Sequence, residues 1–67
     1  MTWYDPDEHL PEPGTNVLFI GPNGRLHVGM FASSKDHPPN FFNLFEQDLT
    51  YPPEEIDGWI CVDKARP

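Results

Sequence analysis

A four-residue turn, Gly21-Pro22-Asn23-Gly24, constrains the fold more than any other feature of this sequence. It separates two runs with high β-propensity, at residues 16–20 and 25–32. Asn-Gly between two such runs favours a tight hairpin, because both residues tolerate a positive φ. The sequence therefore predicts a β-hairpin over residues 16–32.

The apolar pattern of the two runs predicts their places in the sheet. The first run contains Val17-Leu18-Phe19-Ile20, which is apolar on both faces and is typical of a strand with neighbours on either side. In the second run, alternation places Leu26, Val28 and Met30 on one face. We expect that face to point into the core.

The first fifteen residues predict an extended arm. Three prolines exclude a helix interior there, and Gly14 permits a turn just before the first strand. We expect the apolar side chains of Trp3 and Leu10 to be buried against the rest of the domain and to hold the arm there, because burial removes them from water. The prolines are Pro6, Pro11 and Pro13.

The remaining strands and loops are expected within residues 41–63. Residues 41–45 fit both helical and alternating spacing, and their aromatic richness and flanking prolines favour a strand. Residues 46–55 indicate a loop or a single helical turn, and residues 57–63 alternate as a final strand. Whether residues 41–49 form strand or helix stays open at this point.

Short strands joined by Pro- and Gly-rich connections predict one all-β domain over residues 1–67. The expected architecture is a small antiparallel sheet or a partly open barrel of SH3-like size. A chain of 67 residues has room for one core and little more.

Composition excludes several classes of protein. Eleven Asp and Glu against four Lys and Arg give a net charge of −7, which repels phosphate and argues against direct nucleic-acid binding. A single cysteine excludes an internal disulfide, and no apolar run approaches the roughly 20 residues that span a bilayer. The N-terminus has no basic segment followed by an apolar one, so we expect no secretory signal and a cytoplasmic location.

The N-terminal string carries a family resemblance. Trp3, Glu8, Leu10-Pro11, Gly14 and Val17-Leu18 follow the pattern W-x4-E-x-L-P-x-x-G-x-x-V-L. This closely resembles the opening of the domain of unknown function family 551, small proteins common in phages and prophages.

The C-terminal end of that family carries a Trp after a hydrophobic residue and finishes in a Pro-rich tail, and Ile56, Trp59, Val62 and Pro67 look like its counterpart. The family usually has His before this Trp and prolines soon after it, whereas this chain has Gly58 before it and Ile60-Cys61 after it. The resemblance implies a phage or prophage accessory protein with a small β fold, acting in the bacterial host cell. It implies no chemistry and no site residues.

The residues that could carry chemistry lack the spacing it requires. His9, His27, His37 and Cys61 are the candidate metal ligands, and no pair has the spacing of a zinc site. Cys61 lies in a predicted strand, where a small buried side chain is more common than a nucleophile. Adjacent carboxylates in Pro-rich loops are not held across a cleft as acid–base catalysis requires. We expect a non-enzymatic protein without cofactor or metal.

Acidic and aromatic side chains together suggest a protein-binding surface. Carboxylates can steer association with a basic partner, although an acidic surface can also serve only solubility. The aromatic residues exceed what one small core hides, although they can also fill a core poor in Leu and Ile. We expect the partner to be a bacterial host protein or nucleoprotein complex with a basic surface, which the chain binds and inhibits. The alternative is a structural protein that acts as a homo-oligomer, such as a homodimer. The predicted contact residues are Phe41, Phe42, Phe45, Glu46, Asp48, Tyr51, Glu54, Glu55 and Asp57.

Overall fold

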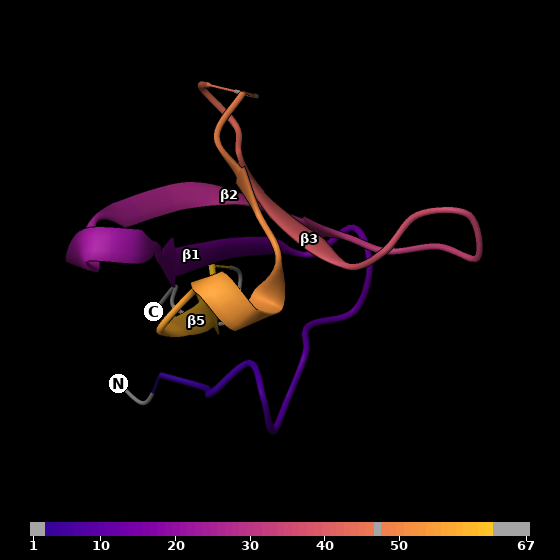
Figure 1. Cartoon of the computed structure of the whole chain (residues 1–67), viewed down its shortest axis with the longest axis horizontal. Helices are drawn as coiled ribbons and strands as arrows, with labels where there is room; N and C mark the ends of the chain where they lie inside the picture. Colours follow the sequence, from indigo (N-terminus) through magenta and orange to yellow (C-terminus); the bar gives the residue numbers. More distant parts are fainter. Residues whose placement is uncertain (1–2, 47, 63–67) are drawn as a thin grey trace.

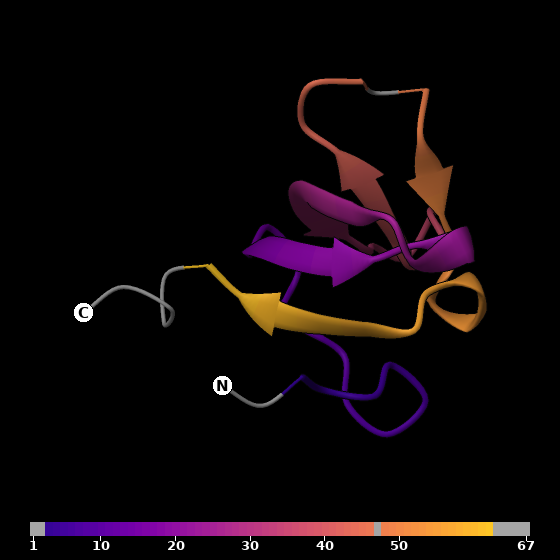
Figure 2. The ribbon, with the colours of Figure 1, turned by 90° about the vertical axis from the view of Figure 1, so that its left-hand side faces the viewer.

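The computed structural model describes residues 3–46 and 48–62, which form an antiparallel sheet of five strands in the order β4-β3-β2-β1-β5 (Figure 1). The sheet is open and does not close into a barrel, as the view in Figure 2 also shows. The predicted all-β class is confirmed, and of its two forms the antiparallel sheet is the observed one. None of the helices in the described residues is long and apolar enough to cross a membrane. The strands are β1 (Asn16–Ile20), β2 (Leu26–Ala32), β3 (Asn40–Asn43), β4 (Thr50–Tyr51) and β5 (Gly58–Cys61).

The predicted hairpin is confirmed by the pairing of β1 with β2. Its turn is a short 3-10 segment, η1 (Pro22–Gly24), in which Asn23 has φ 68° and Gly24 has φ 74°. These positive φ values are the ones that the Asn-Gly pair was expected to supply. Strand β1 also pairs with β5, so its position between two neighbours is confirmed.

The face of β2 that points into the core is the opposite of the predicted one. His27, Gly29 and Phe31 are buried, whereas Leu26 and Val28 are 62% and 39% exposed. The residues of β2 do alternate between the two faces of the sheet, but both sets contain apolar side chains. The pairing of Phe31 with Phe41 on β3 decides between them, because it buries two aromatic rings together at 4.9 Å between centroids.

The hydrophobic core lies on one side of the sheet. Phe19 is at its centre and is fully buried, with its ring 5.5 Å from that of Phe41. After β4, the short 3-10 helix η2 (Pro53–Glu55) leads to Ile56, which is buried in the same cluster. The core consists of Val17, Phe19, Phe31, Phe41, Ile56 and Trp59.

The N-terminal arm is attached through Tyr4 and Trp59. Their backbones exchange two hydrogen bonds, of 2.8 and 3.1 Å, and their rings lie 4.8 Å apart. Trp59 also donates its indole N–H to the carbonyl oxygen of His9 at 2.9 Å. The expected burial of Trp3 and Leu10 is wrong, since these side chains are 38% and 48% exposed. The strand-like pairing turns Tyr4 toward the core side and Trp3 to the other side, because neighbouring side chains in a strand point in opposite directions.

The second half of the chain agrees with the prediction in part. The predicted strand at 41–45 is observed as β3 and stops at Asn43, so the strand interpretation is confirmed and Phe45 lies beyond it. The single helical turn within 46–55 is η2, and the two-residue strand β4 was not predicted. The final strand is β5; the last residue of the predicted run, Asp63, lies outside the described residues.

Candidate interaction surface

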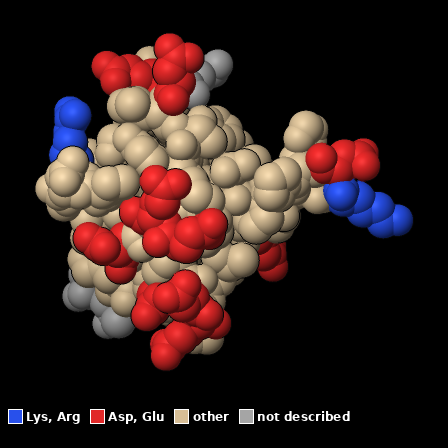
Figure 3. Space-filling view, in the orientation of Figure 1, with Lys and Arg blue, Asp and Glu red and all other residues tan. Residues whose placement is uncertain are grey.

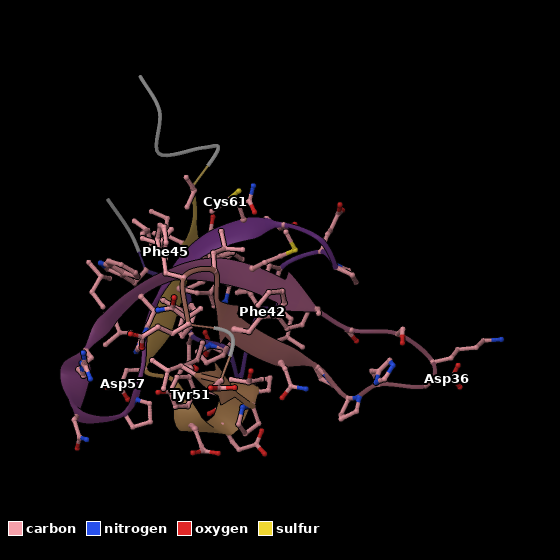
Figure 4. All side chains as sticks on the ribbon, turned by 90° about the horizontal axis from the view of Figure 1, so that it is seen from above. Asp36, Phe42, Phe45, Tyr51, Asp57 and Cys61 are labelled. Atoms are coloured by element: carbon pink, nitrogen blue, oxygen red, sulfur yellow. The ribbon has the colours of Figure 1, made fainter. Side chains whose placement is uncertain are left out.

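The nine predicted contact residues do not form one patch. Phe41 is fully buried in the core, so its assignment to a contact surface is wrong. Tyr51 is half-buried with its ring facing Phe19, at 6.2 Å between centroids, and therefore also serves the core. Phe42 is half-buried and points to the other side of the sheet, as the register with Met30 requires. In Figure 4 the labelled Phe42, Phe45 and Tyr51 do not gather in one place.

Among the aromatic residues predicted to make contacts, Phe45 is the one exposed to solvent, with 82% of its surface accessible. It lies in the turn after β3, where Oδ1 of Asn43 accepts the backbone N–H of Phe45 at 2.7 Å and that of Glu46 at 3.0 Å. Leu49 N–H donates to the carbonyl oxygen of Glu46, and Asn43 N–H donates to that of Leu49. We call residues 43–46 with 48 and 49 the Phe45 turn. Its backbone is held in place while the aromatic ring remains free.

The Phe45 turn is tied to the core through a buried histidine. Nδ2 of Asn43 lies 3.0 Å from Nδ1 of His27, which is 4% exposed. Since Oδ1 of Asn43 accepts two backbone N–H groups, its Nδ2 is the donor here, and Nδ1 of His27 accepts. The imidazole stacks on Phe19 at 4.9 Å and contacts the Tyr51 ring at 5.4 Å. Phe45 is therefore positioned by a chain of contacts that begins in the core.

Sequence reasoning missed the roles of His27 and Asn43. His27 was assigned to the outward face of its strand, and Asn43 was one residue within an ambiguous aromatic run. The available signal was Asn43 itself, because an Asn at the end of a strand commonly accepts backbone N–H groups two and three residues later. The partner of its amide nitrogen depends on strand register and could not be found from the sequence.

The predicted acidic residues are exposed but occupy separate regions. Glu46 and Asp48 belong to the Phe45 turn and, with Phe45 and Leu49, line a shallow hollow. Glu54 and Glu55 lie on η2, and Asp57 follows it. Figure 3 shows carboxylates over the turn, over η2 and over the arm, with few cationic side chains between them. In Figure 4 the labelled Asp36, at the tip of the loop between β2 and β3, lies far from Asp57.

The side of the sheet opposite the core is apolar and open. Leu18 of β1 is paired with Val28 of β2 on one side and with Ile60 of β5 on the other. We call this side the open face. Leu26 and Val28 are among its most exposed side chains. The open face consists of Trp3, Leu18, Ile20, Leu26, Val28, Met30, Phe42 and Leu44, which are exposed or half-buried, and of Ile60, which is 9% exposed.

The candidate metal ligands are distributed over different parts of the fold. His9 and Cys61 line one pocket of about 540 Å³ between the arm and β5, together with Trp59 and Glu12. His27 is in the core instead. Within residues 3–46 and 48–62, no three His, Cys, Asp or Glu side chains gather as a metal site would need.

No protein-family model, curated protein or solved structure matches the chain. The resemblance of its N-terminal motif to family 551 therefore stays a prediction.

Proposed function

We propose that this chain is a non-enzymatic protein-binding module and that Phe45 is its anchor. The observation that carries the proposal is a phenylalanine, 82% exposed, on a turn that Asn43 fixes with two hydrogen bonds. Aromatic anchors dominate the energy of protein interfaces when they enter a pocket on the partner. A fixed backbone lowers the entropy lost on binding, so this turn is suited to present such an anchor.

The charges around the anchor indicate the chemistry of the partner. Glu46 and Asp48 flank Phe45, and the whole chain carries −7. Such a field accelerates association with a basic surface and repels nucleic-acid phosphate. The partner that fits is a protein with an apolar pocket rimmed by Lys or Arg side chains. The carboxylates on η2 would add to long-range steering.

The resemblance to family 551 supplies the biological setting of the proposal. A phage or prophage accessory protein acts in the cytoplasm of a bacterial host, where proteins with basic surfaces include defence and nucleic-acid-handling complexes. The chain would inhibit such a complex by covering its basic surface with the Phe45 turn.

The proposal is tested by using the protein as bait in a nuclease-treated bacterial lysate with washes at graded salt. The affinity of the recovered partner is then measured for Phe45→Ala and for Leu10→Ala, an exposed apolar residue on the arm. We expect Phe45→Ala to weaken binding about tenfold or more and Leu10→Ala to leave it unchanged. Binding of the wild type should also weaken as salt rises. Equal effects of the two variants, or recovery of no partner from lysates of the host, would contradict the proposal.

The role of the charges is tested separately with E46K/D48K and E54K/E55K/D57K. The first variant reverses the charges beside the anchor and should slow association most. The second should slow association less, because η2 does not border Phe45 in the hollow. If neither variant changes the association rate, the steering argument is wrong even where Phe45 matters.

A further inference from the structure

We propose that the open face is covered by a second copy of the chain, so that two sheets pack face to face in a homodimer. The open face shares only Leu44 with the Phe45 turn, and the dimer does not depend on the proposed function. None of the five strands contains an Asp, Glu, Lys or Arg residue, so the open side of the sheet carries only apolar, amide and hydroxyl side chains among its described residues.

The apolar side chains form a continuous band across the sheet. Val28 is paired with Leu18, which in turn is paired with Ile60 on β5. Leu44 extends the band beyond β3, since its N–H donates to the carbonyl oxygen of Val28. At the β5 edge Trp3 lies over Gly58, where a Cβ would be 3.4 Å from the Cβ of Trp3. The band therefore reaches from the arm to the Phe45 turn.

The exposed part of the band has the size that a small dimer needs. Leu26 is 62% exposed, and Trp3, Val28 and Leu44 are each about two-fifths exposed. With the half-buried members, the open face presents on the order of 550 Å² of apolar surface, near the largest patch that a typical monomer tolerates. Two copies would bury about 1,100 Å² between these patches alone, and polar atoms at the rim bring the total into the range of about 1,200–2,000 Å² of specific interfaces.

The distribution of charge favours a second copy over a foreign basic protein. A basic partner would find no carboxylate on the strands of the open face to pair with. A second copy brings the same uncharged apolar band, so a two-fold axis through the face leaves no unpaired charge inside it. Two sheets packed in this way form a β-sandwich with a shared apolar layer.

The salt dependence of the dimer is opposite to that of the proposed partner complex. Two chains of −7 repel each other at long range, and salt screens this repulsion while leaving apolar contacts in place. The dimer should therefore strengthen as salt rises, whereas binding of a basic partner should weaken. The two proposals can fail independently, because one is read from the mass of the protein alone and the other from partner capture.

The mass of the purified protein is measured by sedimentation from about 10 µM to about 1 mM at low and moderate salt. We expect the wild type to approach twice 7.7 kDa at high concentration. L26K/V28K should remain at one copy, because it places two cations on the open face of each chain. Leu10→Lys is the matched control, since Leu10 is 48% exposed on the arm, and this variant should dimerise as the wild type does.

A second measurement covers the case in which L26K/V28K folds poorly. Backbone amide NMR signals of the wild type are followed from low to high concentration. Signals of Leu18, Val28 and Phe42 should shift, and those of the β2–β3 loop should not. A wild type that stays at 7.7 kDa at about 1 mM, dissociation by Leu10→Lys, or shifts confined to other regions would each overturn the proposal.

Discussion

Asn43→Ala tests whether the Phe45 turn is held from the core. The substitution removes the acceptor of the Phe45 and Glu46 N–H groups, which can bond to water instead, at a cost of about 0.5–1 kcal/mol each. It also leaves Nδ1 of the buried His27 without its donor, at a cost of about 1–3 kcal/mol. The expected loss of unfolding free energy is therefore about 2–5 kcal/mol.

That loss is large for a chain of this size. A 67-residue domain has a total stability of about 3–10 kcal/mol, so Asn43→Ala should remove a fifth or more of it. The free energy of unfolding is measured by urea titration followed by Trp fluorescence. In a domain this small, a loss of about 2–5 kcal/mol lowers the melting temperature by about 10–40 °C.

Two further variants make the experiment specific. Asn40→Ala is the matched control, because Asn40 makes one exposed side-chain hydrogen bond, to the carbonyl oxygen of Pro38, and should lose about 0.5 kcal/mol. Asn43→Asp keeps the acceptor for the turn but loses the donor to His27, and should fall between the two alanine variants. If Asn43→Ala costs no more than Asn40→Ala, the link from core to turn is wrong.

Three other substitutions test two glycine positions and one hydrogen bond by the same urea titration. Gly29→Ala should cost about 3 kcal/mol or more, because its Cβ would overlap the Phe42 carbonyl oxygen, whereas Gly24→Ala, at φ 74° in open space, should cost about 1–2 kcal/mol. Equal costs at the two glycines would refute the close approach. Trp59→Phe loses the hydrogen bond to His9, so it should lower the free energy of unfolding by about 1–2 kcal/mol and speed protease cleavage of the arm. An unchanged cleavage rate would show that this bond does not hold the arm.

The fold was predictable where short-range rules decide it. The Asn-Gly turn carries its own φ preference, and the apolar run of β1 needs no partner to be recognised as an inner strand. The inward face of β2 was not predictable in this way, because both faces of that strand are apolar. The buried face of β2 depends on which residues of β1 and β3 lie opposite each of its residues. The deciding pair, Phe31 with Phe41, joins two segments that are separated by a loop in the sequence.

The candidate surface was predictable in composition and not in arrangement. An excess of aromatic residues correctly indicated that some would be exposed, and the structure exposes Phe45 by 82%, Tyr4 by 41% and Trp3 by 38%. Phe41 differs from Phe45 only in its position relative to Asn43, where the strand ends and alternation stops. Which of several phenylalanines enters the core therefore depends on where the strand ends, and that end is set by the Phe45 turn.

The pairing of β1 with both β2 and β5 has a consequence for how the chain folds. The contacts of Phe19 with His27 are local and can form as soon as the hairpin closes, but its contact with Trp59 must wait for the far end of the chain. Closing that long loop costs entropy before any burial compensates for it. We therefore expect folding slower than that of a helical bundle of similar length, with the hairpin formed in the transition state and the Tyr4–Trp59 junction formed after it.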